Sequence, residues 1–66
     1  MSDPFTNPQR GDCIRTYNSL MNVEITRKVI DRRGCKVIFV IDSQVHSICV
    51  DLWQVLVKGG RIVDGE

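Results

Sequence analysis

The chain has 66 residues and a mass of 7.5 kDa, which is enough for one small domain and excludes a second domain or a separate cofactor-binding unit. Hydrophobic residues make up 42% and charged residues 26% of the chain, with a formal net charge of +1, which is typical of an ordered soluble protein. A domain this small buries only about 60% of its unfolded surface, so a roomy catalytic cleft would consume core that the fold needs. Length and composition therefore argue against an enzyme.

Residues 1–9 are mostly polar and contain both prolines. This pattern predicts an extended N-terminal arm, with Phe5 as the side chain that anchors it, ahead of a single small domain over 10–66. The polar start does not resemble a signal peptide, and no apolar run approaches the roughly 18 residues that cross a membrane. The sequence therefore favours a cytoplasmic protein.

Alternating apolar and polar residues predict four successive strands, and Gly34 and a turn over 42–44 predict hairpins between the last three. Arg27 interrupts the apolar side of the second strand, which indicates a bulge or a sheet edge. The third strand is apolar on both sides and is expected to be buried on both. The predicted strands cover residues 12–17, 22–31, 35–41 and 45–50.

A short helix over 52–58 follows, because Asp51 is a suitable N-cap and Gln54 can complete a capping box with it. Its apolar stripe is Leu52, Val55 and Leu56. A closing strand over 61–63 ends the predicted elements.

This order of elements predicts a mainly β fold. It is either a small SH3-like barrel or a strongly curled antiparallel sheet of about five strands, with one short helix near the C-terminus. A single core of this size rarely stabilises a chain without disulfides, metal or a partner subunit, so we also predict a homodimer.

Three segments, 7–15, 50–53 and 59–63, contain a Pro-x-x-Gly-Asp opening, a Trp-bearing turn and a Gly-rich closing strand. Together they cover 18 of the 66 residues, and in these features the chain resembles small prophage and phage accessory proteins. The resemblance implies a compact β-rich domain in a phage or bacterial accessory protein. It implies no activity.

The residues that most often carry chemistry are few. Cys13, Cys35 and Cys49 form no C-x-x-C pair, so they are expected to be free thiols packed as small hydrophobic residues. Zinc bound by these cysteines and His46 is the alternative, but no ligand pair has zinc-knuckle spacing. No nucleophile signature accompanies His46. We therefore predict no catalytic residue, no metal and no cofactor.

Positive charge is concentrated in one predicted hairpin. Five of the nine basic residues fall within 27–36, where Asp31 is the one acid. This surface is interpreted as a solvated hairpin tip, a contact for nucleic-acid phosphates, or a contact for an acidic protein partner. The candidate binding residues are Arg27, Lys28, Arg32, Arg33 and Lys36.

The favoured function is a non-enzymatic binding module that contacts a protein partner through the basic hairpin and a sheet edge. Tyr17 and Trp53 are the candidate interface aromatics. For Trp53 a core position that clamps the short helix onto the sheet is favoured, because a core of this size needs its largest side chain. The alternative is a small nucleic-acid-binding barrel that uses the same hairpin on phosphates. The chain has few aromatic residues on which bases could stack, which argues against this alternative.

Overall fold

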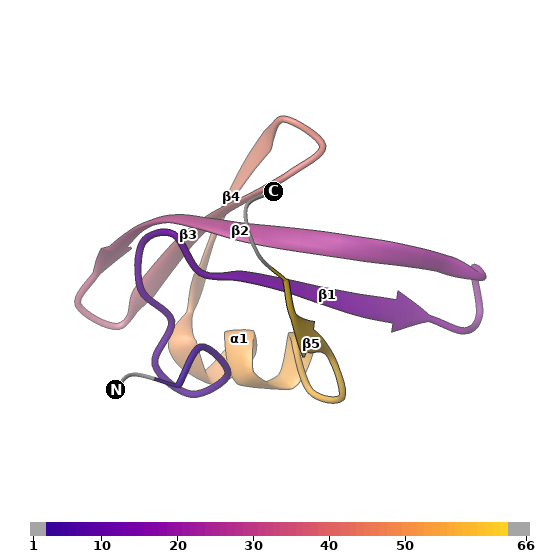
Figure 1. Ribbon diagram of the computed structural model, residues 1–66. Coiled ribbons are helices and arrows are strands. Elements are labelled where there is room, and N and C mark those ends of the chain that lie inside the picture. Colours follow the sequence, from indigo (N-terminus) through magenta and orange to yellow (C-terminus); the bar gives the residue numbers. More distant parts are fainter. Residues whose placement is uncertain (1–2, 64–66) are drawn as a thin grey trace.

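The computed structural model describes residues 3–63, which form one five-stranded sheet and one short helix (Figure 1). The strands lie in the order β4-β3-β2-β1-β5, and every pairing is antiparallel. The mainly β class, with five strands and a short helix near the C-terminus, is confirmed. The elements are β1 (Cys13–Asn18), β2 (Val23–Arg33), β3 (Lys36–Ile41), β4 (Gln44–Cys49), α1 (Val50–Leu56) and β5 (Arg61–Ile62).

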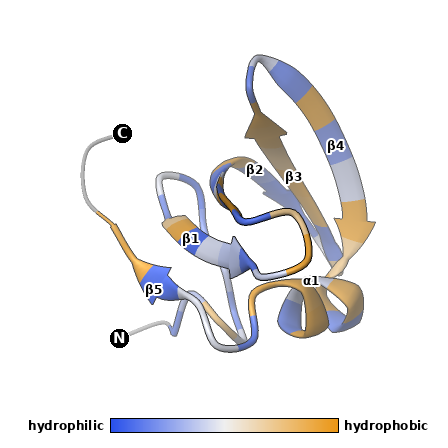
Figure 2. Ribbon diagram, turned by 90° about the vertical axis from the view of Figure 1, so that its right-hand side faces the viewer, coloured by the Kyte–Doolittle hydropathy of each residue, from blue (hydrophilic) through white to orange (hydrophobic). Residues whose placement is uncertain are grey.

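The sheet is curled but does not close into a barrel. β4 and β5 are its two edges, and Figure 2 shows them at opposite sides of the curl with α1 below. β5 has only two residues and pairs only with β1, so no strand joins the two edges. The closed barrel is therefore wrong, and the open curled sheet is confirmed.

Two-residue turns set the registers of the central hairpins. Gly34 follows β2 with φ of 57°, and Asp42 and Ser43 between β3 and β4 have φ of 47° and 69°. Turns with positive φ match the right-handed twist of the strands they connect. Both predicted hairpins are confirmed, with strand ends shifted by no more than two residues at either end.

The core lies between α1 and the face of the sheet that α1 covers, which we call the inner face. The opposite face is the outer face. Ile38 and Val40 of β3 lie on the outer face and are only half-buried, so burial of β3 on both sides is wrong. The buried cluster consists of Ile14, Val29, Val37, Phe39, Trp53 and Val57.

α1 buries a different side from the predicted stripe. Trp53 of α1 and Val57, which follows the helix, are both fully buried. The Trp53 ring packs edge-on against the Phe39 ring, with 5.3 Å between the ring centroids. The predicted stripe, which consists of Leu52, Val55 and Leu56, is exposed instead.

Within residues 3–63 no helix is long and apolar enough to cross a membrane.

The helix also begins earlier than predicted, and its start has no capping box. Cys49 occupies the N-cap position and makes no side-chain cap hydrogen bond, so Asp51 lies inside the first turn. Gln54 Nε2 donates to the Thr6 carbonyl oxygen at 3.2 Å. The N-terminal segment therefore takes the amide that the capping box would have used.

Residues 3–9 form turns that pack against the domain where an extended arm was expected (Figure 1). Trp53 Nε1 donates to the Pro4 carbonyl oxygen at 2.9 Å, and Phe5 packs against the core. Pro8 is fully buried. The segment from residue 3 onwards is thus part of the folded unit and covers one side of α1.

Gly60 lies where the chain returns from α1 to β5. A Cβ at this position would stand 2.8 Å from the Arg15 carbonyl oxygen and 2.8 Å from Thr16 Cγ2. We expect Gly60→Ala to lower the free energy of unfolding by about 1–3 kcal/mol, because backbone must move to admit the methyl group. Urea denaturation followed by circular dichroism measures the change.

The matched control for this prediction is Gly34→Asn. Gly34 has open space around its Cα, and asparagine tolerates its positive φ. A loss for Gly60→Ala no larger than that for Gly34→Asn would contradict the tight packing at Gly60.

Candidate functional site: a cationic groove on the outer face

The five predicted basic residues do not form one surface. β2 and β3 pair regularly up to Val29 opposite Phe39, and pairing resumes with Asp31 opposite Ile38, so Ile30 forms a bulge. The extra residue reverses which side chains of β2 face inward. Arg32 therefore lies opposite buried Val37 on the inner face. Lys28, Arg33 and Lys36 are exposed on the outer face.

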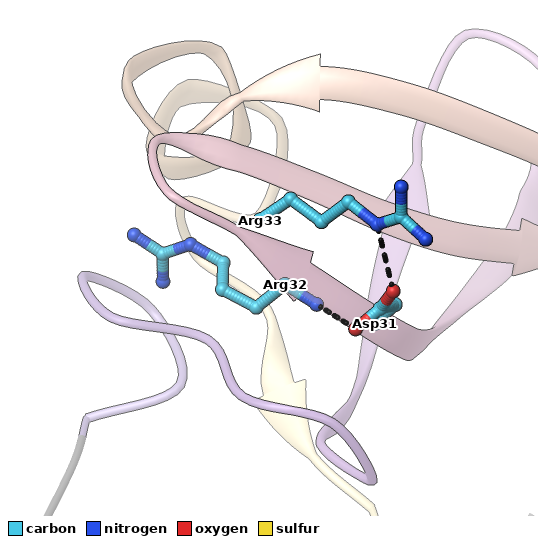
Figure 3. A network of polar contacts seen from close by, with 3 residues as sticks. All are labelled: Asp31, Arg32 and Arg33. Carbon is cyan, nitrogen blue, oxygen red and sulfur yellow. Dashed lines mark hydrogen bonds and ion pairs between the residues drawn. The ribbon is translucent and has the colours of Figure 1, made fainter.

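Arg32 connects the hairpin to the N-terminal segment. Its Nε donates to the Gly34 carbonyl oxygen at 2.9 Å, and one terminal nitrogen donates to Asn7 Oδ1 at 3.0 Å and to the Pro8 carbonyl oxygen at 2.8 Å. Figure 3 shows Arg32 and Arg33 extending in opposite directions from adjacent positions. Arg32 thus makes structural contacts and does not line the groove, and its role in binding stays a prediction.

Arg27 is buried in the sheet with 8% of its surface exposed, so it is not available as a surface contact either. One terminal nitrogen donates to Thr16 Oγ1 at 2.8 Å, but Nε has no acceptor among residues 3–63. Burial lowers the pKa of Arg27 from its ordinary value. Arg27 lies before the bulge and points to the same face of the sheet as Val29. The irregularity in β2 is therefore at Ile30 and not at Arg27, where it was expected.

A buried cation without a carboxylate partner in the described chain costs stability. We expect Arg27→Met to raise the free energy of unfolding by about 1–2 kcal/mol, because methionine keeps the packing and removes the charge. Thr16→Val is the matched variant. It removes the hydroxyl acceptor, leaves the guanidinium buried, and is expected to destabilise. Chemical denaturation of both variants measures the two changes, and a destabilised Arg27→Met would contradict this account.

Two adjoining cavities lie along the outer face of β2, and they share Arg10 and Ile30. The larger has a volume of about 630 Å³, and the smaller, about 260 Å³, continues it past Lys28. We call this surface the cationic groove. Its charged side chains are four cations and one carboxylate, and its larger cavity also contains Ile38 and Ser47. These charged residues are Arg10, Lys28, Asp31, Arg33 and Lys36.

Arg10 is held in the groove by the chain around it. The Gly11 amide donates to the Val29 carbonyl oxygen at 2.9 Å, and the Val29 amide donates to the Asp12 carbonyl oxygen at 2.8 Å. The turn is closed by Asp12 Oδ2, which accepts from the Gln9 amide at 2.8 Å. These bonds extend the pairing of β1 and β2 beyond Cys13 and place Arg10 beside the bulge.

The electrostatics of the groove are dominated by its cations. Hydrogen bonds from the Arg32 amide and the Arg33 side chain, with the charges of Arg33 and Arg10, lower the pKa of Asp31. Arg33 pairs with Asp31 at 3.1 Å, with 80% of the Arg33 side chain exposed (Figure 3). Arg33 also lies directly opposite Lys36, an arrangement that destabilises a sheet. The fold thus maintains an excess of positive charge here.

The two candidate interface aromatics, Trp53 and Tyr17, differ in their exposure to solvent. Trp53 has no exposed surface and belongs to the core. The favoured core position is therefore confirmed, and Trp53 is not an interface residue. Tyr17 is 61% exposed, and its hydroxyl bonds to Asn22 Oδ1. Neither residue lines the groove.

The thiols and the imidazole do not line either cavity of the groove. Cys13 is buried, whereas Cys35 and Cys49 are exposed free cysteines, which corrects their prediction as packed residues. His46 is exposed and stacks on Phe39 at 5.4 Å between ring centroids, on the inner face. Among residues 3–63 no three histidine, cysteine or acidic side chains gather as a metal site. The groove is lined mainly by cations, a chemistry that suits anionic groups.

Arg10 is the groove residue that sequence reasoning missed. It precedes the first strand by a turn and lies far from the basic cluster along the chain. The Gly-Asp pair that follows it could have indicated a tight turn there. Only the pairing of that turn with Val29 makes Arg10 a neighbour of Arg33.

Comparisons with known proteins do not indicate a function for this chain, so the function is proposed from the geometry of the groove. Searches of protein-family models, curated proteins and solved structures find no match to this chain. The resemblance of its terminal segments to phage accessory proteins therefore stays a prediction.

Proposed function

We propose that this protein is a non-enzymatic binding module that receives an acidic segment of a protein partner in its cationic groove and along a sheet edge. One observation carries the proposal. Four cations and a single carboxylate line two adjoining cavities on the outer face of the sheet. Concave surfaces with one sign of charge attract oppositely charged partners and select against others.

The composition of the groove favours a protein segment over nucleic acid. Ile30 and Ile38 supply apolar surface between the cations, and Ser47 supplies a hydroxyl. This mixture suits a peptide whose carboxylates alternate with small apolar or hydroxyl side chains. Single-stranded nucleic acid is recognised largely by stacking of its bases on aromatic rings, and no aromatic residue lines either cavity.

Nucleic acid is the second candidate function, and one observation favours it. Arg10, Arg33 and Lys36 border a single cavity, where they can contact successive phosphates. Binding of that kind would be independent of sequence and would weaken steeply with salt.

The non-enzymatic part of the proposal is supported by the positions of the reactive side chains. His46 packs against Phe39 on the inner face, and the groove is on the outer face. General acid–base chemistry needs a base within hydrogen-bond reach of the reacting group. The sheet separates the imidazole from any anion in the groove.

Titration of fluorescent ligands tests the two functions side by side. We expect a hexapeptide of alternating glutamate and threonine to bind at about 50 mM salt and to weaken at about 200 mM, while a single-stranded oligonucleotide binds less tightly at both. The reversed-charge peptide of lysine and threonine is the control. Stronger binding of the oligonucleotide would overturn the protein proposal in favour of nucleic acid, and binding of neither would overturn both.

The remaining expectations accompany the proposal. The phage or bacterial accessory role is proposed from the resemblance of segments 7–15, 50–53 and 59–63, and the cytoplasmic location stays a prediction. An SH3-like relationship is part of the proposal for the open sheet, and it is supported only by the succession of four antiparallel strands, a short helix and a last strand beside β1. The homodimer stays a prediction from the small core, and sedimentation at micromolar concentration tests it.

A further inference from the structure

β4 is an edge strand with none of the usual protection against pairing. It pairs with β3 at all six of its residues without a bulge, and its other side has no neighbour in the described sheet. Its sequence contains no lysine, arginine or proline, the residues that commonly block pairing at edges. The opposite edge strand, β5, has only two residues. β4 is thus the longer edge available for strand addition.

The backbone groups at this edge can be assigned. The Val50 amide donates to the Cys35 carbonyl oxygen at 2.7 Å, one position beyond the Lys36–Cys49 pair, which marks 35 and 50 as a hydrogen-bonded position of the ladder. Hydrogen-bonded and non-hydrogen-bonded pairs alternate along an antiparallel ladder. The even-numbered residues of β4 therefore bond to β3. The amides and carbonyls that face away from the sheet belong to Val45, Ser47 and Cys49.

The side chains of the same three residues lie on the outer face, which brings the edge and the groove together. Ser47 lines the larger cavity, and Cys49 lies directly opposite Lys36. Strands lie 4.7–4.9 Å apart, so a strand added to β4 would run about 10 Å from Lys36 on β3. A lysine and a glutamate on the same face can span that gap together.

We propose that β4 accepts an extended segment of the partner as a sixth strand, with carboxylate side chains at alternate positions on the outer face that point toward Lys36. This inference rests on the proposed function and specifies how the acidic segment binds. Backbone pairing provides affinity, and the cationic groove selects the side chains. A second copy of the chain fits less well, because its own β4 brings no carboxylate to Lys36.

Selective N-methylation of the glutamate–threonine hexapeptide tests this inference. The added strand is taken as antiparallel, like every other pair in this sheet. Residues opposite Val45, Ser47 and Cys49 then share their face, so the glutamates of a bound peptide direct their own amides toward β4. Methylating the glutamate amides removes the donors that β4 needs. Methylating the threonine amides alters the far side of the peptide only and is the matched control.

We expect the peptide methylated at glutamate to bind at least about tenfold more weakly than the control, the equivalent of roughly 1.4 kcal/mol. Equal binding of both methylated peptides would overturn strand addition while leaving groove binding in place. If the unmodified peptide fails to bind, the proposed function falls and takes this inference with it.

Amide hydrogen exchange gives a second readout that does not depend on affinity. Addition of the unmodified peptide is expected to slow exchange at Val45, Ser47 and Cys49, whereas His46 and Ile48 are already protected by β3. Unchanged exchange at the three edge amides under saturating peptide would overturn the inference. Protection that appears without peptide and rises with protein concentration would assign the edge to a second copy and overturn it as well.

Discussion

Lys36→Glu is expected to weaken binding of the glutamate–threonine peptide by at least about tenfold at low salt, since it replaces an attraction by a repulsion in the larger cavity of the groove. The variant should remain folded. Lys36 lies directly opposite Arg33, and glutamate there would convert a repulsive cross-strand pair into an attractive one. Fluorescence anisotropy measures the affinity, and urea denaturation verifies stability.

Lys58→Glu is the matched control for this prediction. Lys58 is exposed, follows α1 and lines neither cavity, yet its substitution changes the net charge by the same amount. Little effect of Lys58→Glu alongside a large effect of Lys36→Glu would localise binding to the groove. Similar losses in both variants would show that net charge alone attracts the peptide, contrary to the proposed site.

Trp53→Ala is expected to have the largest effect on stability, a loss of about 3–5 kcal/mol. Trp53 is fully buried, contacts the Phe39 ring and donates through Nε1 to the Pro4 carbonyl oxygen. A domain of this size rarely has more than about 3–5 kcal/mol of stability to lose, so much of the variant should be unfolded at 25 °C. Circular dichroism in a urea series measures this loss.

Trp53→Phe separates the packing of this side chain from its hydrogen bond. Phenylalanine retains most of the ring contact with Phe39 and loses the donor to Pro4, so a smaller loss of about 1–2 kcal/mol is expected. A Trp53→Ala variant that unfolds at nearly the wild-type urea concentration would show that α1 contributes little to the core.

Strands and turns were largely predictable because their signals are local. Alternating side chains, Gly34 and the 42–44 turn are visible in short windows, and the corresponding hairpins form within two residues of their expected ends. The helix start was less predictable. Asp51 has good capping chemistry, but the helix already begins at Val50, and Gln54 bonds to Thr6 through a contact 48 residues away in sequence.

The binding site was predictable in charge and not in geometry. Five cations within ten residues indicated an anion-binding surface, but alternation was broken by a bulge that has no sequence signature of its own. Because of Ile30, Arg33 points into the groove and Arg32 points to Pro8. Arg27 is buried although it belongs to the same cluster. Arg10 joins the groove through backbone pairing with β2 that no local pattern reveals.

Residue order alone thus established a small, mainly β chain with tight hairpins, one short helix and a cationic hairpin, because propensity, alternation and charge act between near neighbours. The folded arrangement decided that the sheet stays open, that Trp53 enters the core, and that only Lys28, Arg33 and Lys36 of the five cations join Arg10 on one surface. These outcomes depend on strand register and on contacts between distant segments. A one-residue shift in pairing exchanges the two faces of a strand.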